Sequence, residues 1–145
     1  MYSAVDIADH IVVRCANSGR PVTNLQLQKV LYYVQLNFLQ AFDKYAFEDD
    51  ILALRHGPAV KEVYDKYNIW GRHEIVPRAV QAAKETFSEK DRELVDRVTD
   101  ACLLLDPWEL VERSQKAGAP WQQSFDGNFD KVIPKEIMQR YAREH

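Results

Sequence analysis

Histidine and cysteine are the residues of this sequence that could bind a transition metal or act as a nucleophile. The four histidines stand at positions 10, 56, 73 and 145, too far apart to form the paired ligands that one helix or loop supplies to a metal site. A site assembled across the fold stays an alternative, with His56, His73 and the carboxylates of Asp49 or Asp50 as ligands. The spacing nevertheless predicts that no bound metal ion is needed.

The two cysteines, Cys15 and Cys102, lie on the apolar sides of predicted helices, where a free thiol packs as a small hydrophobic group. A nucleophilic cysteine needs a thiolate beside a base in a partly exposed position, which this setting does not offer. The sequence also lacks the short motifs of serine hydrolases, P-loop enzymes, dinucleotide-binding enzymes and zinc proteases. We therefore expect a protein that is not an enzyme and carries no cofactor, with an uncharacterised enzyme as the least favoured alternative.

The most specific local pattern is the run Arg-His-Gly-Pro-Ala-Val at residues 55–60. Glycine permits a sharp backbone turn and proline suits the first turn of a helix, so the run predicts a bend that leads into a helix starting at Pro58. The bend has two interpretations, a structural connector or a device that presents Arg55 and His56 to a partner. In the second, the guanidinium of Arg55 forms a forked contact with a carboxylate of the partner.

The segment from residue 21 to residue 42 predicts a central helix. Lys29 is its only charged residue, and a helix that is apolar nearly all round normally lies in the core. Tyr32 and Tyr33 point about 100° apart on a helix, so we expect one of them to reach the surface. Steps of four, three and four residues define the inner face, which consists of Leu27, Leu31, Val34 and Phe38.

Further helices are predicted on both sides of this segment. Capping residues and apolar periodicity indicate helices near residues 4–18, 58–69, 88–105, 106–116 and 134–141, with 78–85 as a candidate short helix and a loop around residue 121. We expect a single mostly helical (all-α) domain over residues 1–145, with five to seven helices and at most a small hairpin near 47–56 or 72–77. The side chains expected in the core are Leu27, Leu31, Val34, Phe38, Val63, Tyr64 and Trp121.

Composition narrows the classes of partner. The chain has 145 residues, of which 46% are hydrophobic, and a formal net charge of −3, as is typical of a folded protein. This acidic balance gives no general attraction for phosphates, so nucleic acid is not expected as a partner. No apolar run is long enough to span a membrane, and the first residues lack the apolar core of a signal peptide. We therefore expect a cytoplasmic protein.

Two ordered runs make the sequence similar to a known family. Residues 24–35, Asn-Leu-Gln-Leu-Gln-Lys-Val-Leu-Tyr-Tyr-Val-Gln, resemble the Leu-Gln-Lys-Leu-Leu-Tyr-aromatic signature of the Panacea domain, also known as the SocA-like or GepA-like phage-associated domain. Residues 55–64 resemble the second block of that family, and Trp121 in its Gly-Ala-Pro-Trp context resembles the third. The sequence departs from the family pattern at Leu54, at Ala59 and at residues 114–115.

The resemblance implies a function. Members of the family are antitoxins, so it implies that the chain neutralises a cognate toxin by direct contact, and that it could also deliver the toxin to a bacterial protease as an adaptor. The alternative is a DNA-binding regulator of a phage-related operon, although the central helix has only Lys29 as a basic residue and would make a poor recognition helix. The residues predicted to form or shape the partner-binding surface are Lys29, Tyr32, Tyr33, Arg55, His56, Gly57, Pro58 and Tyr64.

Overall fold

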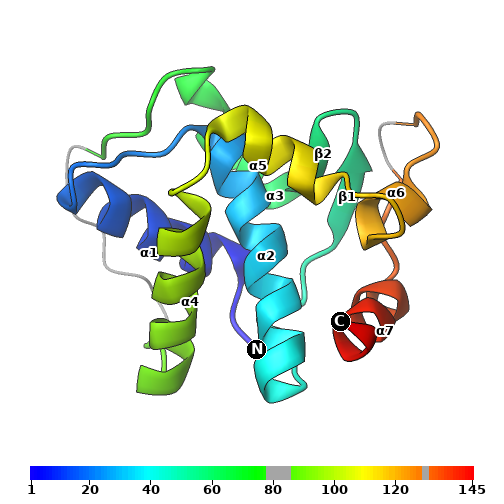
Figure 1. Ribbon diagram of the computed structural model, residues 1–145. Coiled ribbons are helices and arrows are strands. Elements are labelled where there is room, and N and C mark those ends of the chain that lie inside the picture. The colour runs from blue at the N-terminus through cyan, green and yellow to red at the C-terminus, as the bar shows by residue number, and fades with distance from the viewer. Residues whose placement is uncertain (78–85, 129–130) are drawn as a thin grey trace.

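The computed structural model describes residues 1–77, 86–128 and 131–145, and these residues are mostly helical (Figure 1). They contain seven α-helices and one two-stranded antiparallel sheet, which confirms the expected fold; the candidate helix at 78–85 lies outside the described residues. None of the described helices combines the length and the hydrophobicity that crossing a membrane requires. The elements are α1 (Ala4–Asn17), α2 (Asn24–Phe42), β1 (Ile51–Leu54), β2 (Gly57–Val60), α3 (Lys61–Tyr67), the 3-10 turn η1 (Asn68–Trp70), α4 (Glu89–Cys102), α5 (Pro107–Ser114), α6 (Pro120–Ser124) and α7 (Lys135–Glu144).

Helices begin where a side chain can satisfy the first free amide groups. At the start of α2 the amide of Gln26 donates to the Thr23 hydroxyl at 3.2 Å, and the amide of Thr23 donates to the Gln26 side chain at 2.9 Å. This reciprocal pair is a capping box. Ser3, Ser88 and Asp106 each accept a backbone amide in the first turns of α1, α4 and α5. These four starts agree with the sequence-based prediction.

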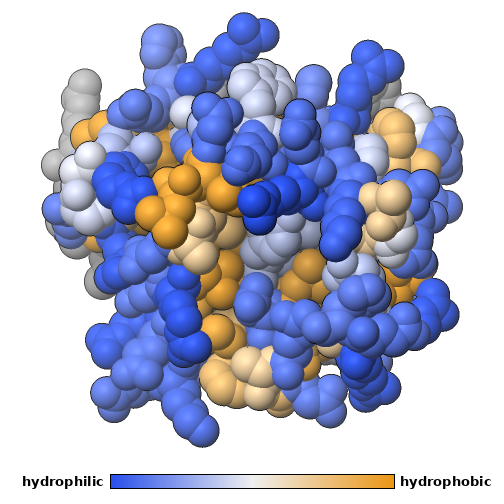
Figure 2. Space-filling view, viewed as in Figure 1, coloured by the Kyte–Doolittle hydropathy of each residue, from blue (hydrophilic) through white to orange (hydrophobic). Residues whose placement is uncertain are grey.

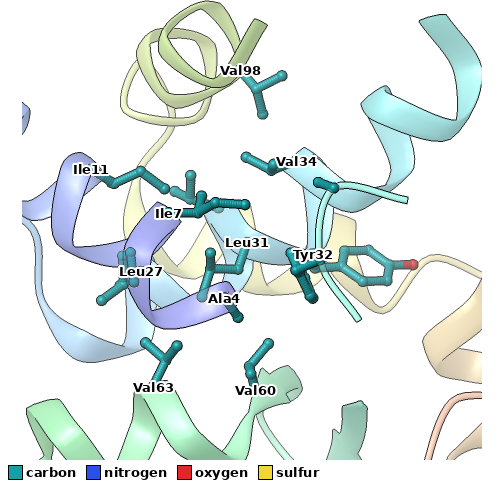
Figure 3. Packing of buried hydrophobic residues seen from close by; sticks show 14 of the residues in the cluster. Ala4, Ile7, Ile11, Leu27, Leu31, Tyr32, Val34, Val60, Val63 and Val98 are labelled. Atoms are coloured by element: carbon teal, nitrogen blue, oxygen red, sulfur yellow. The ribbon is translucent and has the colours of Figure 1, made fainter. Parts of the chain in front are cut away.

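Helix α2 forms the centre of the molecule and packs against α1, α3, α4, α5, α7 and β2 (Figure 1). Figure 3 shows its inner side chains packed against those of α1, with Val98 of α4 on one side and Val60 and Val63 on the other. The predicted inner face is fully buried, and comprises Leu27, Leu31, Val34 and Phe38. The central position expected for this helix is therefore confirmed.

Strands β1 and β2 form a tight hairpin with Arg55 and His56 at its turn, where Leu54 pairs with Gly57. The hairpin overlaps the first of the two expected places and extends beyond it. The prediction that Pro58 starts a helix is wrong, because Pro58 lies in β2 and α3 begins at residue 61. Proline fits here because, among the described residues, β2 has a strand partner on one side only, so the missing amide hydrogen of Pro58 breaks no ladder bond.

Two further expectations are corrected in α3 and α6. Tyr64, expected in the core, is 41% exposed, because Val63 and Tyr67 occupy the inner side of the short helix α3. The expected loop around Trp121 is the helix α6, with Pro120 in its first turn. Trp121 itself is buried as expected, and its indole N–H donates to the carbonyl of Leu54 at 2.6 Å.

Candidate functional site

The outer edge of β2 faces helix α2 instead of a third strand. On the other side of the hairpin, the amide of Ala53 and the carbonyl of Ile51 both bond to the segment 131–133, at 2.8 Å each. In an antiparallel pair, two directly opposite residues either bond to each other or both point their backbone groups outward, away from the partner strand. The backbone groups of Pro58 and Val60, which pair with Ala53 and Ile51, therefore point away from β1.

Side chains of α2 take up these outward groups. The amide of Val60 donates to the Gln28 side-chain oxygen at 2.8 Å, and the ammonium of Lys29 donates to the carbonyl of Pro58 at 3.0 Å. Gln28 also donates to the side chain of Asn24 at 2.9 Å, which fixes its amide group in this orientation. Helix α2 thus completes the sheet edge and holds the hairpin in place.

Lys29 is only 2% exposed, although it carries the one charge of the central helix. Burial away from water disfavours the charged form and lowers the pKa of Lys29 from 10.5 to about 7. Burial therefore favours the uncharged amine of Lys29 over the ammonium. Lys29 supports the hairpin from the side of α2, through its bond to the carbonyl of Pro58, and does not offer a cation to a partner.

Gly57 lies at the point where the hairpin, α2 and α5 meet. Its φ angle is +107°, a conformation that side-chain-bearing residues rarely adopt. A Cβ atom at this position would lie 2.8 Å from Cε of Lys29 and 2.8 Å from Oγ of Ser114. The hairpin can approach the two helices this closely only with glycine here.

The turn of the hairpin presents Arg55 and His56, both exposed, beside helix α5. Directly after α5, the side chain of Gln115 donates to the carbonyl of Arg55 at 2.8 Å and so supports the turn. The ring of His56 packs edge-on against Trp108, with centroids 6.4 Å apart, and Trp108 is 62% exposed. We call the surface formed by Arg55, His56 and Trp108 the hairpin face.

A groove opens on another side of α5, between α2, α4, α5 and α7, with a volume of about 570 Å³. Figure 2 shows apolar surface in the middle of this side of the molecule, with strongly hydrophilic residues around it. We call this groove between the four helices the α2 groove. Its lining includes Tyr33, Leu36 and Asn37 of α2, Arg97 and Val98 of α4, and Leu110 and Arg113 of α5.

Comparison with known protein families gives one match. The SocA-like antitoxin family, Panacea domain, matches residues 27–122, which include the body of α2, the hairpin and Trp121. The chain belongs to this family. Comparisons with curated proteins and with solved structures found no match.

In this Panacea domain, the segments that carry the family signature contact one another. Gln28 and Lys29, from the first segment, bind the backbone of the second segment at residues 58–60. Gln115 and Trp121, from the region of the third, bind the carbonyls of residues 55 and 54. Four residues of these segments therefore hold the hairpin by hydrogen bonds, whereas five of the ten residues at 55–64 are exposed.

The predicted surface residues divide into two groups. The prediction that one of the adjacent tyrosines reaches the surface is confirmed, because half-buried Tyr33 lines the α2 groove while Tyr32 is 1% exposed. Trp108 was missed, since a tryptophan after a helix-starting proline has no pattern that predicts exposure. The buried group, which can act only by shaping the surface, is Lys29, Tyr32, Gly57 and Pro58, and the exposed group is Arg55, His56 and Tyr64.

Metal ligands and thiols are the two kinds of reactive group that the sequence singled out, and the described residues place both. No set of three or more His, Cys, Asp or Glu side chains among them is close enough to hold a metal ion. Both cysteines are buried, which raises the pKa of Cys15 to about 11 and that of Cys102 to about 12. Their thiols are therefore protonated at neutral pH, a poor state for a nucleophile.

Proposed function

We propose that this Panacea domain is an antitoxin that neutralises a cognate toxin in the cytoplasm by binding it directly through the hairpin face. The observation that carries the proposal is membership of the antitoxin family over residues 27–122. The hairpin adds support, because Gln28 and Lys29 of the first signature segment hold it against α2, and Gln115 holds its turn, by hydrogen bonds to the backbone.

The hairpin face has the chemistry of a protein contact. Trp108 offers a large, mostly exposed aromatic surface, and tryptophan and arginine are the residues that most often dominate binding energy at interfaces. Arg55 can form two parallel hydrogen bonds with a carboxylate of the toxin. A turn fixed by buried partners loses little conformational entropy on binding, which favours affinity.

Co-expression with the gene adjacent in the genome tests the proposal. The wild-type chain should restore growth to cells that express the toxin, and Arg55→Ala and Trp108→Ala should each fail to do so while remaining folded by circular dichroism. Arg72→Ala and Ile69→Ala are the matched controls, because both residues are exposed outside the hairpin face and should still rescue. If no neighbouring gene is toxic and no protein co-purifies with the chain, the antitoxin function is wrong.

The same cells test the adaptor role. The measurement is the half-life of the toxin after translation is stopped. If the domain delivers its toxin to a protease, this half-life should be shorter with the wild-type chain than without it. Trp108→Ala should return the half-life to the value without antitoxin. An unchanged half-life together with full rescue means that the domain acts by blocking the toxin alone.

A further inference from the structure

The α2 groove combines an apolar floor with a basic rim. Leu36 and Val98 contribute apolar surface, whereas Arg97 of α4, Arg113 of α5 and Lys116, just after α5, contribute positive charge. Among the described residues that line it there is no aspartate or glutamate. This positive setting stands out in a chain with 22 acidic and 19 basic residues.

The charges of the rim are available for a partner. Within the described ranges, the side chains of Arg97 and Lys116 make no hydrogen bond or ion pair, and Arg113 has only Glu109 at 3.7 Å, on the exposed side of α5. An exposed ion pair of this length contributes little free energy, so Arg113 can exchange it for another carboxylate. Three cations therefore surround the groove without strong internal partners.

A buried phenol next to the groove also lacks a proper partner. Tyr32 is 1% exposed and borders the groove, and among the described residues its hydroxyl makes no hydrogen bond of normal geometry. Burial raises the pKa of Tyr32, and the nearby backbone of Trp121 opposes this rise. Because this hydroxyl is shielded from solvent, Tyr32 contributes only its position in the wall of the groove.

We propose that the α2 groove docks an acidic, amphipathic segment of the toxin, with apolar side chains against Leu36 and Val98 and carboxylates at Arg97, Arg113 and Lys116. The inference rests on the proposed antitoxin function and adds a second contact to the hairpin face. A volume of about 570 Å³ lies within the ~300–1,000 Å³ range of pockets that bind specific ligands, and is large enough for a few side chains. The basic rim selects for negative charge, which a neutral or basic segment cannot provide.

Helix α5 makes a combined contact feasible. Its Trp108 and the Gln115 that follows it face the hairpin turn, whereas its Leu110 and Arg113 line the groove. A toxin that covers α5 therefore reaches the hairpin face with one part and the α2 groove with another.

The test is calorimetric titration of the purified chain with the purified product of the adjacent gene. The double variant R97E/R113E reverses the charge of the rim, and Ala101→Trp fills the groove without changing its charge, since Ala101 is an exposed lining residue. Each should weaken binding at least tenfold. Arg92→Glu, on the same helix α4 but outside the groove, is the matched control and should bind within twofold of wild type.

The outcomes separate the groove from the function. If both groove variants bind as wild type does while Trp108→Ala weakens binding, the groove inference is overturned and the antitoxin function stands. If the adjacent gene product binds no form of the chain, the proposed function fails and the inference fails with it. Circular dichroism and urea unfolding of each variant ensure that lost binding does not reflect a lost fold.

Discussion

The Cε atom of Lys29 lies 2.8 Å from the position that a Cβ atom on Gly57 would occupy, so α2 and the hairpin meet with no room for a side chain between them. The hydroxyl of Ser114 lies equally close to that position from the side of α5. The φ angle of Gly57, +107°, independently disfavours any other residue. Glycine is therefore required here both by the backbone and by the packing.

We predict that Gly57→Ala lowers the free energy of unfolding by about 2–4 kcal/mol, because it adds backbone strain to overpacking against Lys29 and Ser114. Urea unfolding measures the loss. Gly118→Ala is the matched control, since Gly118 has a φ of +82° but nothing within 4 Å of a Cβ. It should lose about 1–2 kcal/mol from strain alone. Equal losses in the two variants would contradict the close packing at Gly57.

The buried Lys29 predicts a dependence of stability on pH. Because burial lowers its pKa from 10.5 to about 7, the unfolded chain binds a proton between these two values that the folded chain does not bind. Stability should therefore rise with pH in this window, by up to about 1.4 kcal/mol per pH unit, and this gain is lost as the pH falls to 7. Urea unfolding of the wild type at pH 6, 7, 8 and 9 measures the slope.

Lys29→Met isolates this contribution, because methionine keeps much of the apolar stem and cannot titrate. The difference in the free energy of unfolding between the wild type and Lys29→Met should change with pH from 7 to 9 and stay constant below pH 6. Lys116→Met, at an exposed lysine, should keep the wild-type slope. A Lys29→Met protein with the same pH slope as wild type would mean that Lys29 is solvated in solution.

A second polar side chain of α2, Gln35, ties down the segment before β1. It is 2% exposed, accepts from the amide of Ala46 at 2.7 Å and donates to the carbonyl of Phe47 at 2.9 Å. Gln35→Leu should leave both backbone groups unpaired and cost about 2–4 kcal/mol in urea unfolding. Gln40→Leu, at an exposed position of the same helix, should change stability by about 0.5 kcal/mol or less. Comparable losses at the two glutamines would argue against this role.

Four helix starts could be predicted because their signals are local. Ser3, Thr23, Ser88 and Asp106 act on amides two or three residues away, a distance that the sequence itself displays. The inner face of α2 was equally clear, since apolar spacing alone determines it. These short-range features are enough to predict a mostly helical fold around residues 24–42.

The hairpin could be predicted only in part: its first strand lies in an expected place, but its second strand does not, because the contacts that stabilise that strand are distant in sequence. In the sequence alone, Pro58 resembles a helix start. It lies in a strand because the segment 131–133 binds one edge of the sheet and helix α2 binds the other. A single lysine in an apolar helix likewise suggests an exposed edge, and only the carbonyl of Pro58, 29 residues away, explains why Lys29 is buried. The α2 groove has the same origin, since four helices contribute to it.

Trp108→Ala should separate an effect on toxin binding from an effect on folding stability more clearly than the other substitutions. Its ring is 62% exposed and contacts His56 only edge-on, so truncation should lower the free energy of unfolding by less than about 1 kcal/mol. If the hairpin face binds the toxin, the same change should cost about 2 kcal/mol or more of binding free energy, which is roughly a 30-fold loss of affinity. Leu104→Ala, at a residue 78% exposed in the turn before α5, is the control and should alter neither quantity. Calorimetry with the adjacent gene product, alongside urea unfolding, measures both. Wild-type affinity in Trp108→Ala would exclude the hairpin face as the main contact, because this tryptophan supplies most of its exposed apolar surface.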